Sequence, residues 1–444
     1  MRKKILFVYP SSYDGYHRII KSRKSFIPSR TLPYLAALTP KEYKTRIIDE
    51  LVDDLVLDED VDLVALTGML RHIPRAIDIA KEFQRRGKTT IIGGVGAFAL
   101  KEEIEKSGAF DSIVIGEADE LWKEILNDFE KCCLKKRYEC THPPQLNGLP
   151  PARFDLLDYE KYMKSFLDIK NLVVPIETSR GCPHNCRFCL VTQYFGKRMR
   201  YRPVAEVVDE IKHHKSKHIL FTDDNIAINP TRARELFLAI KPLGIQWFGQ
   251  FESRIVEHPE LLRLAAESGC HDAFVGIESL IRNNLDSMNK SHSTKLDFKD
   301  VAKAFKEAGV SFFPSLIFGM GHDTPRIIEW TMEEMIKNAV DAVIPWMLTP
   351  VPRTACYEEY KNEGRLIHED YSLYDSWHVV IKPKQMTPEE LTESFWRGLR
   401  RFYSIPSILQ RAYLGKRRDI SWFSCNLYFR QLVNKGLHPF AGNS

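Results

Sequence analysis

Three cysteines lie close together in the segment SRGCPHNCRFC (179–189), at Cys182, Cys186 and Cys189. Cysteine thiolates bind zinc and iron–sulfur clusters. A structural zinc site needs four ligands, and the segment offers no suitable fourth, because His184 stands inside the motif at a spacing that suits a loop. A 4Fe-4S cluster is usually held by four thiolates, so three would leave one iron open to an outside ligand. The spacing therefore favours a cluster, with zinc and unrelated thiols as alternatives.

The cysteine motif follows the first of six apolar runs that alternate with helical patterns. Such an alternation indicates parallel β/α units. Six units are fewer than the eight that close a TIM barrel, so the sequence predicts an open, partial (β/α)6 TIM barrel over residues 171–365. The predicted strands are VVPIET, HILFTDD, GIQWFGQ, DAFVGIES, FFPSLIFG and DAVIPWMLTP.

Residues 1–135 predict a separate α/β domain. Five short apolar runs alternate with helical patterns, as in a doubly wound, Rossmann-like parallel sheet. The amphipathic segment PRAIDIAKEFQRRG is expected to end at Gly87. Sheets of this kind bind ligands at the carboxyl ends of their strands. The predicted strands are KILFVYP, KTRIIDE, VDLVALTG, TTIIGG and SIVIGEA.

The carboxyl ends of these predicted strands are rich in glycine. Glycine lets a flat or bulky ligand approach the backbone, although the same residues also serve as plain turn glycines, which is the alternative explanation. The candidate ligand-binding residues are Thr67, Gly68, Gly93, Gly94, Gly116 and Glu117.

The cysteine segment resembles the signature of the radical S-adenosylmethionine (SAM) superfamily. The resemblance implies that its three cysteines hold a 4Fe-4S cluster whose open iron binds SAM, and that an electron from the cluster cleaves SAM to a 5′-deoxyadenosyl radical. It also implies that Phe188, just before the third cysteine, lies near the adenine. The downstream segments FTDDN, GQFESRI and GIES resemble family segments that contact SAM. They imply roles for Asp223, Asp224, Gln250, Ser253 and Glu278, each with a plain structural role as the alternative.

Almost the whole chain resembles the radical SAM subgroup that carries a cobalamin-binding domain in front of the barrel. The matching segments are TLPYLAALTP, IIGG, VIGEADELW, LPPARFDLLDY and LTPVPRT. The resemblance implies that the glycine-rich strand ends bind the nucleotide tail of cobalamin and that the corrin faces the barrel. The D-x-H-x-x-G loop that supplies a histidine to cobalt in other cobalamin proteins is missing, since LVDDLVLDED follows IIDE. We interpret His72 as a loop histidine.

The reaction implied by this subgroup is cobalamin-dependent C-methylation of an unactivated carbon. A second hypothesis is cyclisation, oxidation or carbon–carbon coupling of an apolar, lipid-like or tetrapyrrole-like substrate, with or without cobalamin. A third, from another class, is a cobalamin-binding regulator whose cluster only senses redox state. Transfer of the SAM methyl group separates the first two hypotheses, and formation of 5′-deoxyadenosine excludes the third.

Two further regions complete the predicted organisation. Residues 136–170 are rich in proline and charge and predict a linker, and residues 366–444 predict a mainly helical C-terminal region. In this C-terminal region, Thr387 and Glu390 form the pattern of a capping box at a helix start. The tail from residue 396 carries nine Lys or Arg against one acid and is rich in aromatic residues. It predicts either a helical cap with its charges in water or a peripheral contact with anionic lipid.

Cys356 follows LTPVPRT, in the part of the chain expected to contact substrate. One interpretation is a small apolar core residue. The other is a catalytic role, as a hydrogen-atom donor to a substrate radical. Arg353 stands where related proteins usually have glycine.

Composition limits the cellular setting and the partners. The net charge of +5 is small for 444 residues, and nucleic-acid-binding motifs are absent, so no nucleic-acid partner is expected. The nine cysteines are odd in number and no export signal is present, which indicates a reducing cytoplasm. The expected partners are a small-molecule or lipid-like substrate and an external electron donor of the flavodoxin or ferredoxin type.

Overall fold

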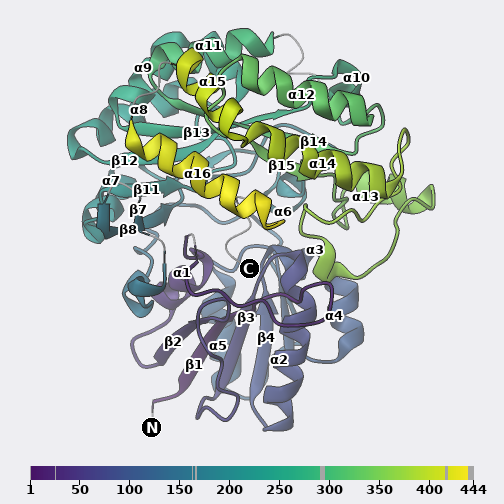
Figure 1. The fold of residues 1–444 in the computed structure, drawn as a ribbon. Coiled ribbons are helices and arrows are strands. Elements are labelled where there is room, and N and C mark those ends of the chain that lie inside the picture. Colours follow the sequence, from purple (N-terminus) through teal and green to yellow (C-terminus); the bar gives the residue numbers. More distant parts are fainter. Residues whose placement is uncertain are drawn as a thin grey trace.

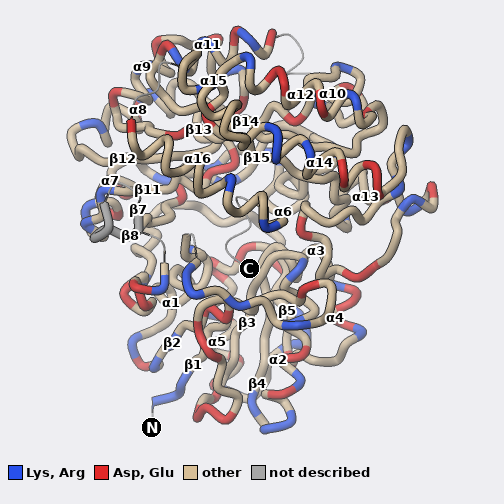
Figure 2. Tube along the Cα trace, viewed as in Figure 1, with Lys and Arg blue, Asp and Glu red and all other residues tan. Residues whose placement is uncertain are grey.

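The protein was analysed as a computed structural model, in which two α/β units lie one above the other (Figure 1). The N-terminal unit lies below, the barrel-like unit lies above, and the C-terminal helices cross the front of the barrel. Acidic and basic residues are interspersed over both units (Figure 2). The structure describes residues 2–25, 27–162, 164–165, 168–290, 296–415 and 419–438, with only the backbone described at 164–165 and 168–172.

The N-terminal unit contains a six-stranded parallel sheet with strand order β2-β1-β3-β4-β5-β6. The order of the first five strands is that of a doubly wound fold, which confirms the predicted Rossmann-like sheet. All five residues of β3 are buried, because helices cover both faces of the sheet. The strands are β1 (Lys4–Tyr9), β2 (Lys44–Asp49), β3 (Leu63–Thr67), β4 (Thr89–Gly93), β5 (Ser112–Ile115) and β6 (Arg137–Glu139).

Two groups of helices form the outer layers of this sheet. Apolar residues of α1 and α5 pack on one face, and those of α2 and α4 pack on the other. Gly87, with φ of +68°, follows the end of α2 as predicted. The sequence did not predict the short helices α3 and α4. The helices are α1 (Thr31–Leu38), α2 (Ile73–Arg85), α3 (Val95–Ala99), α4 (Lys101–Ser107) and α5 (Leu121–Glu130).

The second unit is a curled sheet with strand order β15-β14-β13-β12-β11-β8-β7. All neighbours pair in parallel except β7 and β8, so six consecutive parallel strands confirm the predicted partial barrel. The strands are β7 (Lys164–Ser165), β8 (Asp168–Ile176), β11 (His218–Phe221), β12 (Gln246–Glu252), β13 (Cys270–Glu278), β14 (Ser311–Phe318) and β15 (Ile344–Met347).

Helices cover the convex face of the barrel sheet. Trp247 of β12 packs against Phe237 of α8, with ring centroids 5.2 Å apart. The next residue, Phe248, points to the opposite face and contacts Phe274, because side chains alternate along a strand. The helices are α6 (Val191–Phe195), α7 (Val204–His214), α8 (Pro230–Ile240), α9 (Pro259–Glu267), α10 (Arg282–Ser287), α11 (Phe298–Ala308) and α12 (Pro325–Lys337).

The C-terminal region is mainly helical, as predicted, and α14 packs along α12. Thr387 and Glu390 form the predicted capping box at the start of α14. Within the described residues, no helix combines the length and hydrophobicity needed to span a membrane. The helices are α13 (Ala355–Asn362), α14 (Pro388–Phe402), α15 (Ile405–Gly415) and α16 (Ile420–Asn434).

Regular structure occurs at both ends of the segment 136–170 that the sequence predicted as a linker. Strand β6 adds to the first sheet, while β7 and the start of β8 belong to the barrel sheet. The regular structure that is described between them consists of two short 3-10 helices, Phe154–Leu156 and Tyr159–Lys161.

Candidate active site

The three predicted cluster cysteines lie in one loop between β9 (Ser179–Arg180) and α6. Gly181 opens the loop with φ of +100°, and a Cβ there would lie 2.5 Å from a backbone oxygen. The loop is anchored to the end of α10, because the Arg187 N–H donates to the Met288 carbonyl at 3.0 Å and the Asn289 amide donates to the Asn185 carbonyl at 2.8 Å. This anchoring fixes the cysteines at the carboxyl ends of the barrel strands.

The thiols of Cys182, Cys186 and Cys189 are free of disulfide bonds and partly exposed. Burial raises the pKa of Cys186 to about 11 and that of Cys189 to about 12. Such thiols stay protonated at neutral pH unless a bound metal displaces the proton. Among the described residues, no group of three His, Cys, Asp or Glu side chains is arranged to hold a single metal ion. Each thiolate of a 4Fe-4S cluster binds a different iron, so the three cysteines of a cluster do not converge on a single ion.

Two adjacent carboxylates at the end of β11 have different surroundings. Asp223 is buried and accepts hydrogen bonds from the Thr178 backbone N–H at 3.0 Å, from the Thr178 hydroxyl at 2.8 Å and from the Ser179 hydroxyl. Asp224 has no hydrogen-bond partner within the described chain and lies near Cys182 and Cys189. Burial, with Asp223 as a neighbouring charge, raises the pKa of Asp224 to about 7. Asp223 therefore holds the backbone before the cysteine loop, and Asp224 is the carboxylate that faces the site.

A buried ion pair lies beside the same loop. Glu278, at the end of β13, has φ of +64° and accepts a hydrogen bond from the Lys290 ammonium at 2.5 Å. The Ser315 hydroxyl also donates to Glu278, at 3.3 Å. Burial opposes the charge of Lys290, but Glu278 outweighs it and raises the pKa of the ammonium. Lys290 also interacts electrostatically with Cys186 and Cys189, so a fixed cation accompanies the thiols. A cation and free thiols at one strand edge suit a cluster and an anionic ligand group.

The remaining predicted SAM residues are not all brought together. Gln250 lies on the same face of β12 as Phe248 and is exposed towards the concave side of the barrel. Ser253 is buried and lines a separate cavity of about 290 Å³ with residues of α10, α11 and α12. Phe188 is partly buried within the cysteine loop and packs on an apolar cluster that includes Tyr360. The structure thus groups Phe188, Asp224 and Glu278 with the cysteines, and it places Ser253 elsewhere.

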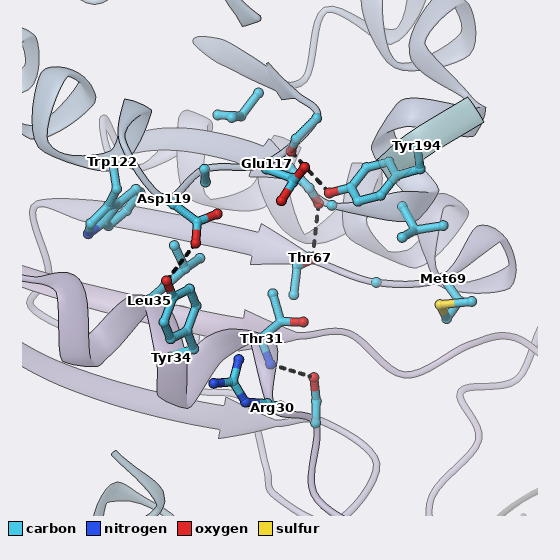
Figure 3. Close-up of a pocket in the computed structure, with 18 of the residues that line it drawn as sticks. Arg30, Thr31, Tyr34, Leu35, Thr67, Met69, Glu117, Asp119, Trp122 and Tyr194 are labelled. Atoms are coloured by element: carbon cyan, nitrogen blue, oxygen red, sulfur yellow. Dashed lines mark hydrogen bonds between the residues drawn. The ribbon is translucent and has the colours of Figure 1, made fainter. Parts of the chain in front are cut away.

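All six residues predicted at the first sheet's strand ends line one cavity of about 350 Å³: Thr67, Gly68, Gly93, Gly94, Gly116 and Glu117. Figure 3 shows the side chains that surround this cavity. The Tyr194 hydroxyl reaches across from α6 and donates to the Gly116 carbonyl at 3.0 Å. The barrel contributes Thr222 and Asp224 to the same cavity. This cavity, called the smaller cavity from here on, therefore lies where the strand ends of the two sheets face each other.

The backbone conformation also requires glycine at some positions of the smaller cavity. Gly94 has φ of +92° and ψ of −173°, a region essentially restricted to glycine. A Cβ at Gly94 would lie 2.4 Å from the Thr67 hydroxyl, and a Cβ at Gly116 would lie 3.0 Å from Cys140. The positive φ values and the close contacts support the turn explanation, while room for a ligand stays a prediction for these cavity-lining glycines.

Buried ion pairs join the two units beside the smaller cavity. Arg180, just before the cysteine loop, donates to Glu117 at 2.6 Å and to Asp119 at 2.7 Å, and it also pairs with Glu177. Arg200 donates to the other Glu117 oxygen at 2.6 Å. Both carboxylate oxygens of Glu117 are engaged with the barrel, so Glu117 connects the two units as well as lining the cavity.

A larger cavity lies between the units and the C-terminal region. Its volume is about 1430 Å³, and it shares Tyr9, Ser29, Met69 and Val95 with the smaller cavity. Its walls come from the loop after β1, the segment after β3, the end of β15 and the C-terminal region. Cavities that bind small molecules typically measure about 300–1,000 Å³, so this one has room for a large ligand.

Cys356 lines neither of these two cavities. It is buried in the apolar core beside Tyr357 and Tyr360, and its backbone N–H donates to the Arg187 carbonyl at 2.9 Å. Burial raises the pKa of its thiol to about 12. This environment favours a packing role. Arg353 has φ of +74° and pairs with Glu102 of α4 at 2.8 Å.

Sequence reasoning missed three residues of this region, namely Arg180, Tyr194 and Lys290. Arg180 and Tyr194 connect units that are far apart in the sequence, so no local pattern marks them. Lys290 lies 12 positions after Glu278, and only the turn after α10 brings the two together. His184, interpreted as a loop residue, pairs with Glu252 at 2.7 Å.

Residues 176–335 match the model of the radical SAM superfamily. Over 430 residues, the chain is 28% identical to bacteriochlorophyllide d C-12(1)-methyltransferase of Chlorobaculum tepidum, and the match spans 95% of this chain and 92% of that protein. Over 428 residues it is 28% identical to bacteriochlorophyllide d C-8(2)-methyltransferase of the same organism, with 93% of each chain covered.

The fold is also similar to a solved structure, that of the radical SAM methyltransferase TsrM from Kitasatospora setae with cobalamin and a [4Fe-4S] cluster bound. The TM-score is 0.68 at 14% identity, and the match covers 98% of this chain and 100% of that one. At this level of identity the match shows a common fold, with both units and the C-terminal region included.

Proposed function

The chain belongs to the radical SAM superfamily, as its sequence predicted, and we propose that it is a cobalamin-dependent radical SAM methyltransferase. The observation that carries this proposal is the smaller cavity. It is lined by the glycine-rich strand ends of the first sheet and also by Asp224, which lies beside two of the three cysteines. A corrinoid nucleotide and a cluster would thus be held at facing strand ends.

In this proposal, a bound 4Fe-4S cluster would supply the electron that cleaves SAM, and bound cobalamin would supply the methyl group that replaces a hydrogen atom on an unactivated carbon, with that hydrogen leaving in 5′-deoxyadenosine. The protein would hold and orient these groups. Cys182, Cys186 and Cys189 would hold the cluster. The floor for the cobalamin nucleotide would be formed by Thr67, Gly68, Gly93, Gly94 and Gly116.

Charged groups beside the cysteine loop orient SAM. The Lys290 ammonium, fixed by Glu278, suits the SAM carboxylate, and the Asp224 carboxylate suits its ammonium. Phe188 offers an aromatic face to the adenine, and Gln250 offers an amide from the concave face of β12. Thr178 and Ser179 have an indirect role. They hydrogen-bond to Asp223 and so fix the backbone that leads into the cysteine loop.

The test is anaerobic reconstitution with iron, sulfide and cobalamin, followed by reaction with SAM that carries an isotopically labelled methyl group. An external donor of the flavodoxin or ferredoxin type, expected for this reaction, supplies electrons. We expect 5′-deoxyadenosine and label in the product. Deoxyadenosine without label transfer would favour cyclisation, oxidation or coupling, and zinc in place of iron and sulfide would overturn the proposal.

We further propose a cytoplasmic protein that docks peripherally on anionic lipid through the α15–α16 region. Ile405, Leu409 and Tyr413 follow one another at a spacing of four along α15, and their side chains are 42%, 58% and 84% exposed. Ile420, at the start of α16, is 83% exposed. Residues four apart share one face of a helix, and the tail that carries them is strongly basic, which suits an anionic surface.

Co-sedimentation with vesicles of phosphatidylserine and phosphatidylcholine tests this docking. Leu409→Glu with Tyr413→Glu should reduce the bound fraction, while Leu238→Glu should not, because Leu238 is equally exposed but lies on α8. Equal binding by the double variant and the unchanged protein would exclude the helix pair as the anchor.

A further inference from the structure

We propose that the larger cavity binds a flat, ring-containing substrate through a carboxylate that pairs with Arg71. The inference deepens the proposed function, since it names the substrate class of the same enzyme. It depends on the charge balance of the cavity, on its aromatic walls and on its volume of about 1430 Å³.

Arg71 is a cation with no close acidic partner in the described chain, although Asp375 interacts with it electrostatically at longer range. It lies in the turn after β3 and lines the larger cavity. No Asp or Glu oxygen of the described chain lies within ion-pair distance of its guanidinium. The guanidinium lies over the ring of Trp377, 4.8 Å from the ring centroid. Burial lowers the pKa of Arg71, yet an arginine stays charged in proteins.

Within the described residues, the side chain of the partly buried Arg71 makes a single hydrogen bond. Its Nε donates to His72 Nε2 at 3.2 Å, while the Met69 N–H donates to His72 Nδ1 at 3.0 Å. Burial and the charge of Arg71 hold the pKa of His72 well below its usual value, so the imidazole is neutral. A neutral imidazole has one acceptor nitrogen and cannot accept both bonds. Arg71 is partly buried, and a partly desolvated charge with so few hydrogen bonds is stabilised when a ligand completes its bonding.

The acids that line the same cavity are already engaged. Asp14 pairs with Arg18 at 2.7 Å, and Asp375 accepts from the His378 ring at 2.7 Å and from two backbone N–H groups. Asp49 accepts from the Tyr162 hydroxyl at 3.1 Å. Lys21 also lines the cavity, but it pairs with Asp54 at 3.5 Å and donates to the Asp53 carbonyl. Among the lysines and arginines of the described cavity residues, Arg71 is therefore the one without an ion pair.

The walls near Arg71 favour a flat ring. His438 stacks on Trp346 and on Trp377, with ring centroids 5.0 Å and 5.5 Å apart, and its Nε2–H donates to the Pro345 carbonyl at 2.7 Å. Burial lowers the pKa of His438 to about 4, so its ring is neutral. Trp346 and Trp377 line the cavity. Tyr9 and Trp396 add further aromatic surface. Stacked aromatic walls bury planar ring systems without demanding polar partners.

A carboxylate fits Arg71 better than other polar groups do. The guanidinium plane is covered on one side by Trp377, which leaves its N–H edge for a planar, two-oxygen acceptor. The same edge could meet the phosphate of a cobalamin nucleotide, because the two cavities adjoin and share Met69 as a lining residue. The two sources of negative charge predict different consequences for an Arg71 variant.

The test compares two probes, protoporphyrin IX and its dimethyl ester, titrated into the anaerobic holoenzyme with porphyrin fluorescence as the readout. We expect the unchanged protein to bind the free acid about 30-fold or more tightly than the ester, as befits a desolvated charge pair. Arg71→Gln should remove this preference and leave the ester affinity within about twofold. Arg71→Lys should retain part of it.

Arg46→Gln is the control, because Arg46 is an arginine of the same unit that pairs with Glu59, and neither residue lines the cavity. It should keep the full preference for the acid. The proposal is overturned if neither probe binds, if acid and ester bind equally, or if Arg71→Gln keeps the preference. Loss of cobalamin from Arg71→Gln, seen as loss of corrin absorption, would assign Arg71 to the nucleotide phosphate instead. Because binding needs no turnover, these results are independent of whether label reaches a product.

Discussion

The strand ends of the two parallel sheets meet at the smaller cavity, but they are built differently. The first sheet ends in glycines and small residues, so the backbone itself forms the surface there. The barrel ends in thiols, carboxylates and a lysine, so side chains form the surface. One edge provides room for a large group, and the other provides ligands. We therefore expect ligand binding at the first edge to be sensitive to added side-chain atoms, and ligand binding at the second edge to be sensitive to the removal of side-chain ligands.

The largest effect is expected from removal of a ligand at the barrel edge. Cys182→Ala should abolish iron and sulfide binding and with it all formation of 5′-deoxyadenosine, since two thiolates cannot replace three. Cobalamin binding should persist, because its predicted residues belong to the other edge. Metal analysis and corrin absorption check both statements. Cys270→Ala is the control, as Cys270 is a buried core residue; a retained cluster in Cys182→Ala would contradict the assignment.

The next largest effect concerns the connection between the edges. Arg180→Met leaves Glu117, Asp119 and Glu177 without their shared buried cation, and we expect a loss of about 3–5 kcal/mol in the free energy of unfolding. Denaturant titration measures it. Arg153→Met, which removes an exposed pair with Asp155, should cost about 1 kcal/mol or less. Similar losses in the two variants would show that the buried network does not stabilise the interface.

A smaller effect is expected from an added atom at the first edge. Gly94→Ala should cost about 1–3 kcal/mol, because alanine disfavours this backbone conformation and its Cβ would meet Thr67. It should also lower cobalamin affinity and leave the cluster intact. Gly108→Ala has a positive φ but open space around its Cβ, so it should leave cobalamin bound. Equal cobalamin content in both variants would contradict a backbone-formed site.

The smallest effect is a pH dependence of the same interface. Burial opposes the ionisation of Asp119 and Glu177, but Arg180 outweighs it and holds the pKa of both carboxyls below their usual values of 3.8 and 4.5. Their contribution to stability is therefore complete above these values and is lost as the pH falls below them. The difference in unfolding free energy between the unchanged protein and Arg180→Met should shrink from pH 6 to about pH 3. A constant difference would contradict the linkage.

Much of this architecture follows from local patterns in the sequence. The alternation of short apolar runs with amphipathic segments was enough to predict both parallel sheets, because burial on both faces demands continuous apolar strands. The helix start at Thr387 and the end of α2 near Gly87 follow from capping rules. The cysteine spacing indicated a cluster loop, since its three ligands lie within eight residues.

The sequence alone did not distinguish between neighbours with the same chemistry. Asp223 and Asp224 are adjacent acids just beyond the end of β11, yet one holds the backbone and the other faces the site. Ser253 was grouped with Gln250, but it lies beyond the end of β12, in a short 3-10 helix, and lines a cavity away from the cysteines. Such choices depend on the exact end of each strand, which periodicity places only to within a residue or two.

Both sheets and the cysteine loop could be predicted from the sequence, since each depends on residues that are close in the chain. How these parts meet could be learned only from the folded chain. Arg180 with Glu117, Lys290 with Glu278 and Arg71 over Trp377 are pairings across long stretches of chain. Their charges are stabilised or left unsatisfied by burial, and burial is a property of the folded chain rather than of any segment of it.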